Sequence, residues 1–249
     1  MIHSFLLIGQ SNMAGRGTLG SVPPITAKNV AVLRNGRWQG IYYPVNCDRP
    51  FSGHSLAESF ADAYAKAHPD VLVGLIPCAD GGTSLDQWRE GGLLYDHAVM
   101  QTRLALRTST VVGVLWHQGE ADCSPALYPL YEEKFNRIKA ALRRDLELHD
   151  VPFLVGGLGD FLPLRGGSLA NYAHVNEALV RIADADPLCG FVSAEGLGEN
   201  GDNLHFSAPA LREFGLRYYD EFLKLEKKDR VFIDKPREDG AVRSEMELL

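Results

Sequence analysis

Ser11 lies where a hydroxyl group has the surroundings that a nucleophile needs. It follows an apolar run at residues 3–8, within the turn GQSNM. Ligands of open α/β sheets bind at the carboxyl ends of the strands, so a serine at the end of the first strand is a candidate for covalent catalysis. Gly9 permits a sharp turn, and the helix opening at Asn12 offers free N–H groups to an anion. We take Ser11 as the candidate nucleophile, with Gln10 and Asn12 as candidate contacts to the oxyanion or substrate, although a lone serine here is more often a helix cap.

Asp202 and His205 supply the acid and the base that would activate such a serine. They stand three residues apart in GDNLH. In a loop or an opening helical turn this spacing lets the carboxylate reach the imidazole and hold its tautomer, which leaves the other ring nitrogen free to take the proton of Ser11. A single loop histidine usually only faces solvent, so the inference rests on the pair.

A second polar cluster, HQGE, follows the apolar run at residues 111–116. Gln118 offers an amide donor and Glu120 a carboxylate, again at the carboxyl end of a strand. Taken alone, Glu120 would equally be an acid in the first turn of a helix, where it favours the helix dipole. His117 is a candidate for touching the substrate or for supporting the site through a hydrogen bond.

Paired glycines form the fourth candidate feature. Gly81 and Gly82 lie in PCADGGTS, directly after the apolar run at residues 71–76. Two adjacent glycines let the backbone approach a ligand and point an N–H group at it, as an oxyanion site requires. Glycines after a strand are also common in turns, so this cluster alone proves nothing.

A dinucleotide site is a weaker interpretation of the same region. Residues 15–20 spell GxGxxG, but no strand directly precedes them and the chain runs into two prolines rather than a helix, whereas a dinucleotide fingerprint needs both. Arg16, within this segment, would contact a carboxylate or hydroxyl of a ligand, but a solvated loop arginine is the simpler expectation.

A metal site is the other alternative. His117, Glu120 and His205 provide two imidazoles and a carboxylate, which can hold zinc. A zinc site would give Ser11 and Gln118 no role in catalysis. We therefore expect neither a metal nor another cofactor.

The motifs GQSNM, DGGTS, WHQGE and DNLH, in this order over about residues 3–207, resemble the SGNH hydrolase superfamily. GQSN and HQGE resemble its sialate O-acetylesterase and acetylxylan esterase branch, carbohydrate esterase family 6. The resemblance implies a flavodoxin-like, three-layer α/β/α fold. It also implies a serine esterase that removes O-acetyl groups from carbohydrates through an acyl-enzyme.

The resemblance implies Ser11 as the nucleophile and His205 as the base. It also implies three oxyanion donors: the N–H of Ser11, the N–H of Gly81 or Gly82, and the side-chain amide of Gln118. Gln118 stands where the wider superfamily has an asparagine, although the branch itself carries HQGE.

Two acids compete to orient His205. Asp202 fits the DxxH pattern of the superfamily, whereas Glu120 fits the acid of the HQGE branch. We favour Asp202 because of its spacing, with Glu120 as a second carboxylate that shares the imidazole or shapes the Gln118 loop.

The implied substrate is an acetylated xylo-oligosaccharide or an acetylated sialic acid. A short-chain lipase or thioesterase of the same superfamily would share the triad and differ in its pocket. A catalytically silent carbohydrate-binding domain is the non-enzymatic alternative, and the intact set of candidate residues argues against it. The sequence does not indicate an oligomeric state.

Short apolar runs that alternate with segments of helical period predict the architecture. The runs at residues 3–8, 71–76, 111–116, 152–156 and 189–193 predict a five-stranded parallel sheet with helices on both faces.

The region between the first two runs differs from the rest. Prolines and aromatic residues interrupt any long helix over about residues 17–53, so we expect a lobe of loops and short strands beside Ser11. Trp38, Tyr42 and Tyr43 are candidates to face a sugar ring, although aromatic residues in such a lobe more often form its local core.

Size and charge favour a small enzyme over a nucleic-acid-binding protein. At 249 residues the chain can bury a full core, and we expect one domain over residues 1–225. The charged tail at 226–249 is expected to strap over the body or to be partly disordered. A net charge of −7, with no dense run of Lys and Arg before the tail, disfavours a polyanionic partner.

Cysteine usage and the start of the chain bear on the compartment. Four scattered cysteines without CxxC spacing read as reduced thiols rather than a zinc or disulfide framework. The first residues lack a basic region and a cleavable apolar stretch, and no run approaches the roughly 18 apolar residues of a membrane span. We therefore expect a cytoplasmic protein without a membrane partner.

Overall fold

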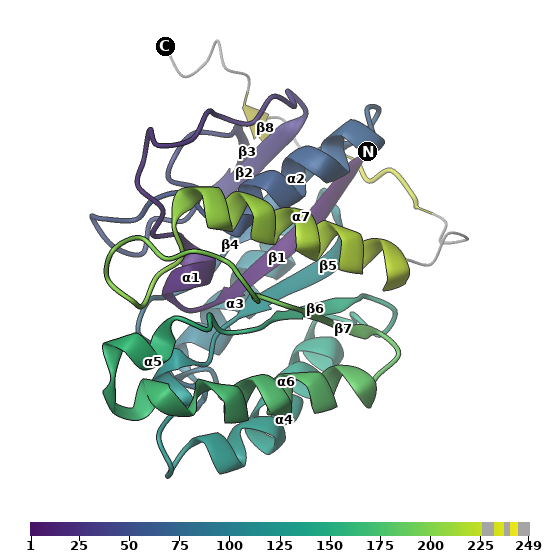
Figure 1. Cartoon of the computed structure of the whole chain (residues 1–249). Helices are drawn as coiled ribbons and strands as arrows, with labels where there is room; N and C mark the ends of the chain where they lie inside the picture. Colours follow the sequence, from purple (N-terminus) through teal and green to yellow (C-terminus); the bar gives the residue numbers. More distant parts are fainter. Residues whose placement is uncertain (226–231, 237–239, 244–249) are drawn as a thin grey trace.

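The structure is a computed structural model that describes residues 1–225, 232–236 and 240–243. Its strands form one sheet in the order β7-β6-β5-β1-β4-β2-β3-β8 (Figure 1). Their bounds are Ile2–Gly9 (β1), Val30–Arg34 (β2), Arg37–Gly40 (β3), Leu72–Pro77 (β4), Thr110–His117 (β5), Phe153–Gly156 (β6), Cys189–Val192 (β7) and Val242–Arg243 (β8). The α-helices span Ser11–Ala14 (α1), Leu56–Ala67 (α2), Leu93–Ala105 (α3), Tyr131–Asp145 (α4), Leu162–Arg165 (α5), Tyr172–Asp184 (α6) and Ala208–Leu225 (α7).

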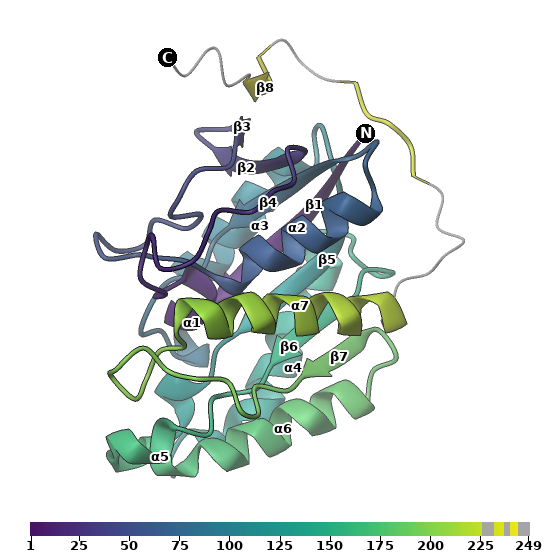
Figure 2. The same ribbon diagram turned by 45° about the horizontal axis from the view of Figure 1, so that its top comes forward.

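Helices flank the sheet, as the sequence predicts. α2 and α7 pack against each other in front of the sheet in Figure 1, whereas α3 lies behind it. α4 and α6 pack against each other beside β6 and β7, as the turned view shows (Figure 2). The predicted three-layer α/β/α fold is confirmed.

The centre of the sheet explains why its strands are easy to recognise. Every residue of β1 is buried, and in β5 only the first residue is not. Strands covered on both faces need continuous apolar runs. β1 pairs in parallel with β4 and with β5, so that Leu7 lies opposite Pro77 and Gly9 opposite His117. The loops that leave these three strands therefore emerge at the same edge of the sheet.

The predicted count of five strands is wrong. The five predicted runs correspond to β1, β4, β5, β6 and β7, but the described residues hold eight strands. β2 and β3 form an antiparallel hairpin within residues 17–53, and β2 extends the sheet beside β4. These strands are short and sit among turn residues, so their apolar pattern is weak.

The three aromatic residues of this lobe lie in different surroundings. Trp38 is buried, and its indole N–H donates to the hydroxyl of Thr108 over 2.9 Å. Tyr42 stacks under the Arg34 guanidinium, 3.6 Å from the ring centroid. The hydroxyl of Tyr43 accepts the N–H of Ile25 over 3.0 Å. Trp38 and Tyr43 thus contact the protein itself, as expected for a local core, whereas Tyr42 is 48% exposed.

The described parts of the predicted charged tail lie against the body. β8 pairs in parallel with β3, and Lys235 donates to the carbonyl of Leu106 over 2.7 Å. These contacts agree with the strap prediction for 232–236 and 240–243. The alternative prediction, partial disorder, falls on 226–231, 237–239 and 244–249, which lie outside the described residues.

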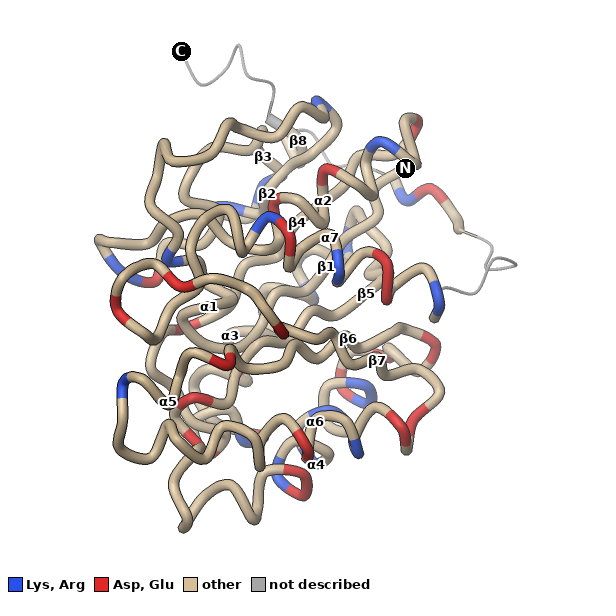
Figure 3. The backbone as a smooth tube through the Cα atoms, in the orientation of Figure 1, with Lys and Arg blue, Asp and Glu red and all other residues tan. Residues whose placement is uncertain are grey.

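Charge is mixed along the chain. Lys and Arg positions alternate with Asp and Glu positions around the fold (Figure 3). Within the described ranges, no helix is both long and apolar enough to cross a membrane.

Candidate active site

The turn after β1 holds Ser11 rigidly at the edge of the sheet. Gly9 has a φ of +135°, and a Cβ at this position would lie 2.1 Å from the carbonyl oxygen of His117, so only glycine fits. The N–H of Gln10 donates to that same carbonyl over 2.9 Å. Ser11 then opens α1, and its own N–H has no hydrogen-bond partner among the described residues.

His205 and Asp202 complete a chain of hydrogen bonds from Ser11. The Ser11 Oγ lies 3.1 Å from His205 Nε2, and His205 Nδ1 lies 2.6 Å from Asp202 Oδ2. A carboxylate only accepts, so Nδ1 carries the ring proton and Nε2 is left to accept the serine hydroxyl. The structure thus brings the three residues into the arrangement that activates a serine.

The carboxylate of Asp202 is fixed by its own loop, residues 199–206, called the histidine loop below. Its Oδ1 accepts the N–H groups of Leu204 and His205 at 2.9 and 2.8 Å. Burial by itself raises the pKa of Asp202, but these N–H groups and the His205 ring outweigh it and hold that pKa below its usual value. Asp202 is therefore ionised when it faces the imidazole.

Asn12 ties the histidine loop to the rest of the site. Its Oδ1 accepts the N–H of Phe206 over 3.1 Å, and its Nδ2 donates to the carbonyl of Leu204 and to Glu120 Oε1 at 3.2 and 2.6 Å. The side chain is buried and uses both of its ends in these contacts. Asn12 therefore positions neighbouring loops, and the expectation that its side chain contacts the substrate is not supported.

Glu120 does not contact His205, because both ring nitrogens of that histidine are taken. Its Oε1 accepts from Asn12, and its buried Oε2 has no hydrogen-bond partner in the described structure. Of the two competing acids, Asp202 is the one in contact with the imidazole.

The contacts of Gln118 correct the expectation that its amide is an oxyanion donor. Its Nε2 donates to the carbonyl of Thr83 over 2.9 Å and to Asp122 Oδ2 over 2.6 Å. These two bonds use both amide hydrogens, and the side chain is fully buried. Gln118 instead joins the loop after β5 to the loop after β4.

Gln10 and His117 are likewise turned inward. Gln10 Oε1 accepts the N–H groups of Gly119 and Ala121 at 3.3 and 3.4 Å, which supports residues 117–122, called the HQGE loop below. His117 Nε2 donates to the carbonyl of Gly157 over 3.1 Å. Burial lowers the pKa of His117 despite the nearby Glu120 charge, so the ring is neutral. His117 therefore has the second of the two roles expected for it, support of the site through a hydrogen bond, and the side-chain oxygen of Gln10 is engaged within the protein.

The metal interpretation finds no support in these contacts. His117 and His205 use ring nitrogens on a carbonyl, a serine and a carboxylate. Among the described residues, no three side chains of His, Cys, Asp or Glu come together in a group that would hold an ion.

The backbone N–H groups of Gly81 and Gly82 differ in their hydrogen bonding. The N–H of Gly81 donates to Asp48 Oδ2 over 2.9 Å. The N–H of Gly82 has no partner among the described residues, and its φ of +78° favours glycine. A Cβ on Gly81 would stand 3.5 Å from the Cβ of Ser11, so this loop lies beside the candidate nucleophile.

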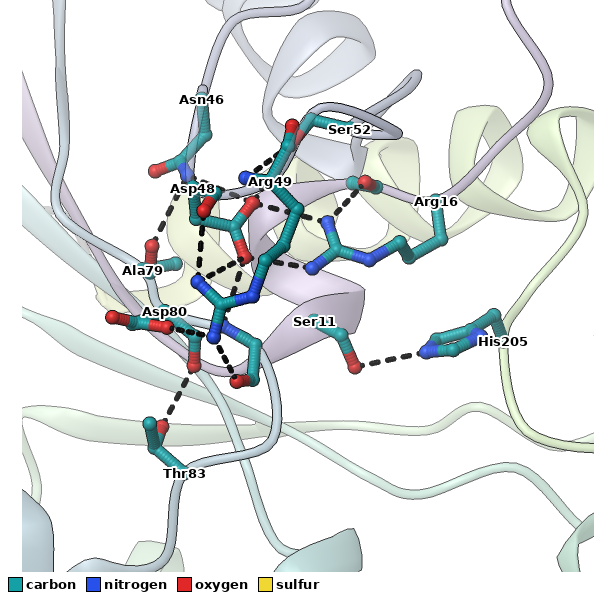
Figure 4. Close-up of polar contacts among 12 residues, drawn as sticks. Ser11, Arg16, Asn46, Asp48, Arg49, Ser52, Ala79, Asp80, Thr83 and His205 are labelled. Atoms are coloured by element: carbon teal, nitrogen blue, oxygen red, sulfur yellow. Dashed lines mark hydrogen bonds and ion pairs between the residues drawn. The ribbon is translucent and has the colours of Figure 1, made fainter.

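Sequence reasoning missed Asp48 as a site residue and placed Arg16 in solvent. Arg16 is not solvated as expected: its side chain is 5% exposed and makes a paired contact with Asp48, which is 4% exposed. The distances are 3.1 Å from Nη1 to Oδ1 and 2.7 Å from Nη2 to Oδ2 (Figure 4). The proline-rich lobe around Asp48 carries no periodic pattern, so its charge was the only signal available.

A cleft of about 510 Å³ opens beside the paired glycines. Gly81 and Gly82 contribute to its lining, together with Arg49, Arg89 and Leu93. Arg49 forms an ion pair with Asp80 at 2.7 Å, whereas the described residues offer Arg89 no carboxylate partner. The cleft therefore combines a free N–H group with a guanidinium that donates to the carbonyl of Asp86 and has no carboxylate partner among the described residues.

Comparison with known proteins gives consistent matches over nearly the whole chain. A family model described as a carbohydrate esterase, sialic acid-specific acetylesterase, matches residues 1–224. A probable carbohydrate esterase of Arabidopsis thaliana is 30% identical over 241 residues, which cover 88% of this chain and 89% of that protein.

Solved structures of other proteins also match this chain over most of its length. A protein from Arabidopsis thaliana is 28% identical with a TM-score of 0.80, and the match covers 89% of this chain and 97% of that one. NanS is 18% identical with a TM-score of 0.70, covering 90% of this chain and 97% of its own, a likeness that concerns the fold.

Proposed function

The chain belongs to the carbohydrate esterase family described as sialic acid-specific acetylesterases, and from this premise we propose that it removes O-acetyl groups from sugars through an acyl-enzyme on Ser11. The observation that carries the proposal is the chain of hydrogen bonds from Ser11 through His205 to Asp202. Each of the three groups has the partner that its role requires.

The first half-reaction uses His205 as a general base. His205 Nε2 takes the hydroxyl proton as Ser11 Oγ attacks the acetyl carbonyl, and Asp202 stabilises the imidazolium that forms. The proton then passes to the departing sugar oxygen. In the second half-reaction, water attacks the acetyl-serine with the same base, and acetate leaves.

Two backbone groups are suited to stabilise the negative oxygen of the tetrahedral intermediate. The N–H groups of Ser11 and Gly82 lack partners among the described residues, whereas that of Gly81 is taken by Asp48. N–H groups that are already oriented stabilise charge without further reorganisation. We assign the oxyanion site to Ser11 and Gly82, without the Gln118 side chain.

The cleft beside Gly82 supports an acidic sugar as the substrate. Arg89 has no carboxylate partner there, and a planar guanidinium binds a carboxylate well. An O-acetylated sialic acid carries such a carboxylate, whereas a xylo-oligosaccharide built from neutral sugars does not. We therefore propose the acetylated sialic acid as the better substrate of the two.

Ser11→Ala tests the mechanism. The expected loss in kcat on a chromogenic acetate ester is about 10⁴-fold to 10⁶-fold with an unchanged melting temperature, because the nucleophile is gone while the fold remains. Ser168→Ala is the matched control, since Ser168 is exposed in the short 3-10 helix before α6. A serine-directed phosphonate should label Ser11 in the parent protein; label on another residue, or near-normal turnover by Ser11→Ala, would refute the mechanism.

Substrate comparison tests the rest of the proposal. We expect kcat/KM to be higher for an acetylated sialic acid than for an acetylated xylo-oligosaccharide, and higher for acetate than for octanoate esters. Preference for octanoate would move the assignment to a lipase or thioesterase.

A further inference from the structure

We propose that Asp48, held by Arg16, is a positioning residue that sets the Gly81–Gly82 segment for oxyanion binding. This inference rests on the proposed function, because it concerns how the oxyanion site is built. Asp48 touches no reacting atom. It acts through the backbone N–H of Gly81, which its carboxylate accepts over 2.9 Å.

The carboxylate of Asp48 joins three segments that are separate in the sequence. Arg16, in the segment after α1, donates to both of its oxygens. Ser52, in the lobe, donates to Oδ1 over 2.8 Å, and Gly81, after β4, donates to Oδ2. Figure 4 shows Arg16 and Ser52 converging on the Asp48 carboxylate near Ser11. A shift of Asp48 would therefore move the loop that faces the nucleophile.

The backbone of Gly81 lies close to the Arg16–Asp48 ion pair. A Cβ at Gly81 would lie 2.4 Å from Arg16 Nη2 and 3.0 Å from Asp48 Oδ2, in addition to its contact with Ser11. Real Cβ atoms do not come as close as 2.4 Å, so any side chain at this position would displace the Arg16 guanidinium from its contact with Asp48. The ion pair therefore lies directly against the glycine segment to which we assign the oxyanion site.

Stability alone does not explain a buried ion pair at this place. Burying two charges carries a desolvation cost that their attraction offsets only when the geometry is good, and apolar replacements are often as stable. Here the Arg16 and Asp48 side chains are 5% and 4% exposed, a short distance from a reacting serine. Hydrogen bonds from Arg16 and Ser52 overcome the effect of burial and keep the pKa of Asp48 below its usual value, so the carboxylate stays charged and accepting.

The neighbouring Arg49 reinforces the same segment from the other side. Its Nη2 donates to the carbonyl of Gly81 over 2.9 Å and forms an ion pair with Asp80. The N–H and the carbonyl of Gly81 are thus both engaged. With the preceding glycine fixed at both ends, the N–H of Gly82 is the group left to meet the substrate oxygen.

Asp48→Asn tests the inference. An amide whose oxygen accepts from Gly81 and from Arg16 Nη2 places its NH2 group where Oδ1 stood, facing Arg16 Nη1. Two donors then oppose each other and the charge of the pair is lost, so the side chain should shift and take Gly81 with it. We expect kcat for an acetate ester to fall about 10-fold to 100-fold with KM changed less than about threefold, because the lost interaction acts in the transition state. Inhibition by methylboronic acid, which forms a tetrahedral adduct with Ser11, should weaken by a similar factor, whereas inhibition by the product acetate should not.

Asp186→Asn is the matched control. Asp186 also pairs with two cations, Lys139 and Arg143, and accepts a backbone N–H from Leu188. It precedes β7 and so lies at the opposite edge of the sheet from Ser11. This variant should keep the parent kcat and the parent affinity for methylboronic acid.

Ser52→Ala provides a milder variant in case Asp48→Asn does not fold. It removes one donor to Asp48 and leaves the contacts to Arg16 and Gly81 in place, so a kcat loss of about threefold to tenfold is expected. If folded Asp48→Asn and Ser52→Ala keep the parent kcat while the phosphonate still labels Ser11, the positioning role is wrong and the proposed esterase mechanism stands. If Ser11 is not labelled in the parent protein, the proposed function itself fails.

Discussion

The histidine loop and the HQGE loop contain the same kinds of side chain in opposite surroundings. In the histidine loop, Asp202 and His205 are partly exposed, and His205 contacts Ser11 while Asp202 contacts His205. In the HQGE loop, Gln118 and Glu120 are buried and bind other loops. An acid and a polar nitrogen at a strand end therefore do not identify a catalytic group; the atoms that remain free to meet a substrate do.

The largest expected effect separates the two acids. Asp202→Asn should lower kcat about 10⁴-fold, because the amide no longer holds the productive tautomer of His205. Glu120→Gln should cost far less, since the amide can still accept from Asn12. Both are measured as kcat on one acetate ester. The reverse ranking would give the orienting role to Glu120, and two large losses would mean that both acids act on one imidazole.

Gln118→Ala tests whether the HQGE loop has a structural or a catalytic role. Because this amide donates to Thr83 and Asp122, its removal leaves the buried carbonyl of Thr83 unpaired and takes one of two donors from Asp122 Oδ2, which keeps the N–H of Leu85. The unfolding free energy should therefore fall by about 1 to 3 kcal/mol. The kcat of the folded variant should fall less than the 10²-fold to 10³-fold typical of a lost oxyanion donor. Denaturant unfolding and kcat are measured together. A stable variant with a kcat loss of that full size would restore Gln118 to the oxyanion site.

The smallest expected effect is a difference in pH dependence between the two loops. The pKa of Asp202 is lowered, so its contribution to stability is present above its unfolded pKa and is lost as pH falls through the folded value. Burial, only partly opposed by Gln118 and Leu85, raises the pKa of Asp122, so its contribution has the opposite sign and declines as pH rises above the unfolded value.

Melting temperatures of the parent, Asp202→Asn and Asp122→Asn between about pH 3 and 8 check this contrast. Relative to the parent, the loss of melting temperature in Asp202→Asn should shrink toward low pH, whereas the loss in Asp122→Asn should be greatest there. Each change with pH corresponds to roughly 1 kcal/mol of unfolding free energy after allowance for solvent screening. Parallel curves for the two variants would contradict the assigned directions.

The sequence predicted those parts of the fold that depend on local pattern. β1 and β5 are recognisable because strands buried on both faces need unbroken apolar runs. Asp202 and His205 are recognisable as a pair because three residues separate them in one loop. Ser11 was found because it follows directly on such a strand.

Features that depend on distant partners were not predictable in the same way. Asp48 meets Arg16 from 32 residues away and Gly81 from 33, and nothing local marks any of the three as partners. The HQGE motif gave the residue type of Gln118, but only three-dimensional contacts show that its hydrogens are already used. The β2–β3 hairpin was missed because short strands among prolines lack a clear period.

The bond from Ser11 to His205 joins residues 194 apart in the chain. Asn12 spans a similar distance when it accepts the N–H of Phe206. During synthesis Ser11 emerges long before His205, so under the proposed mechanism the growing chain cannot hydrolyse an ester until almost the whole sheet is available. Loop closure over such a distance is slow compared with local folding. Recovery of esterase activity should therefore report the last tertiary step of refolding rather than the formation of the sheet.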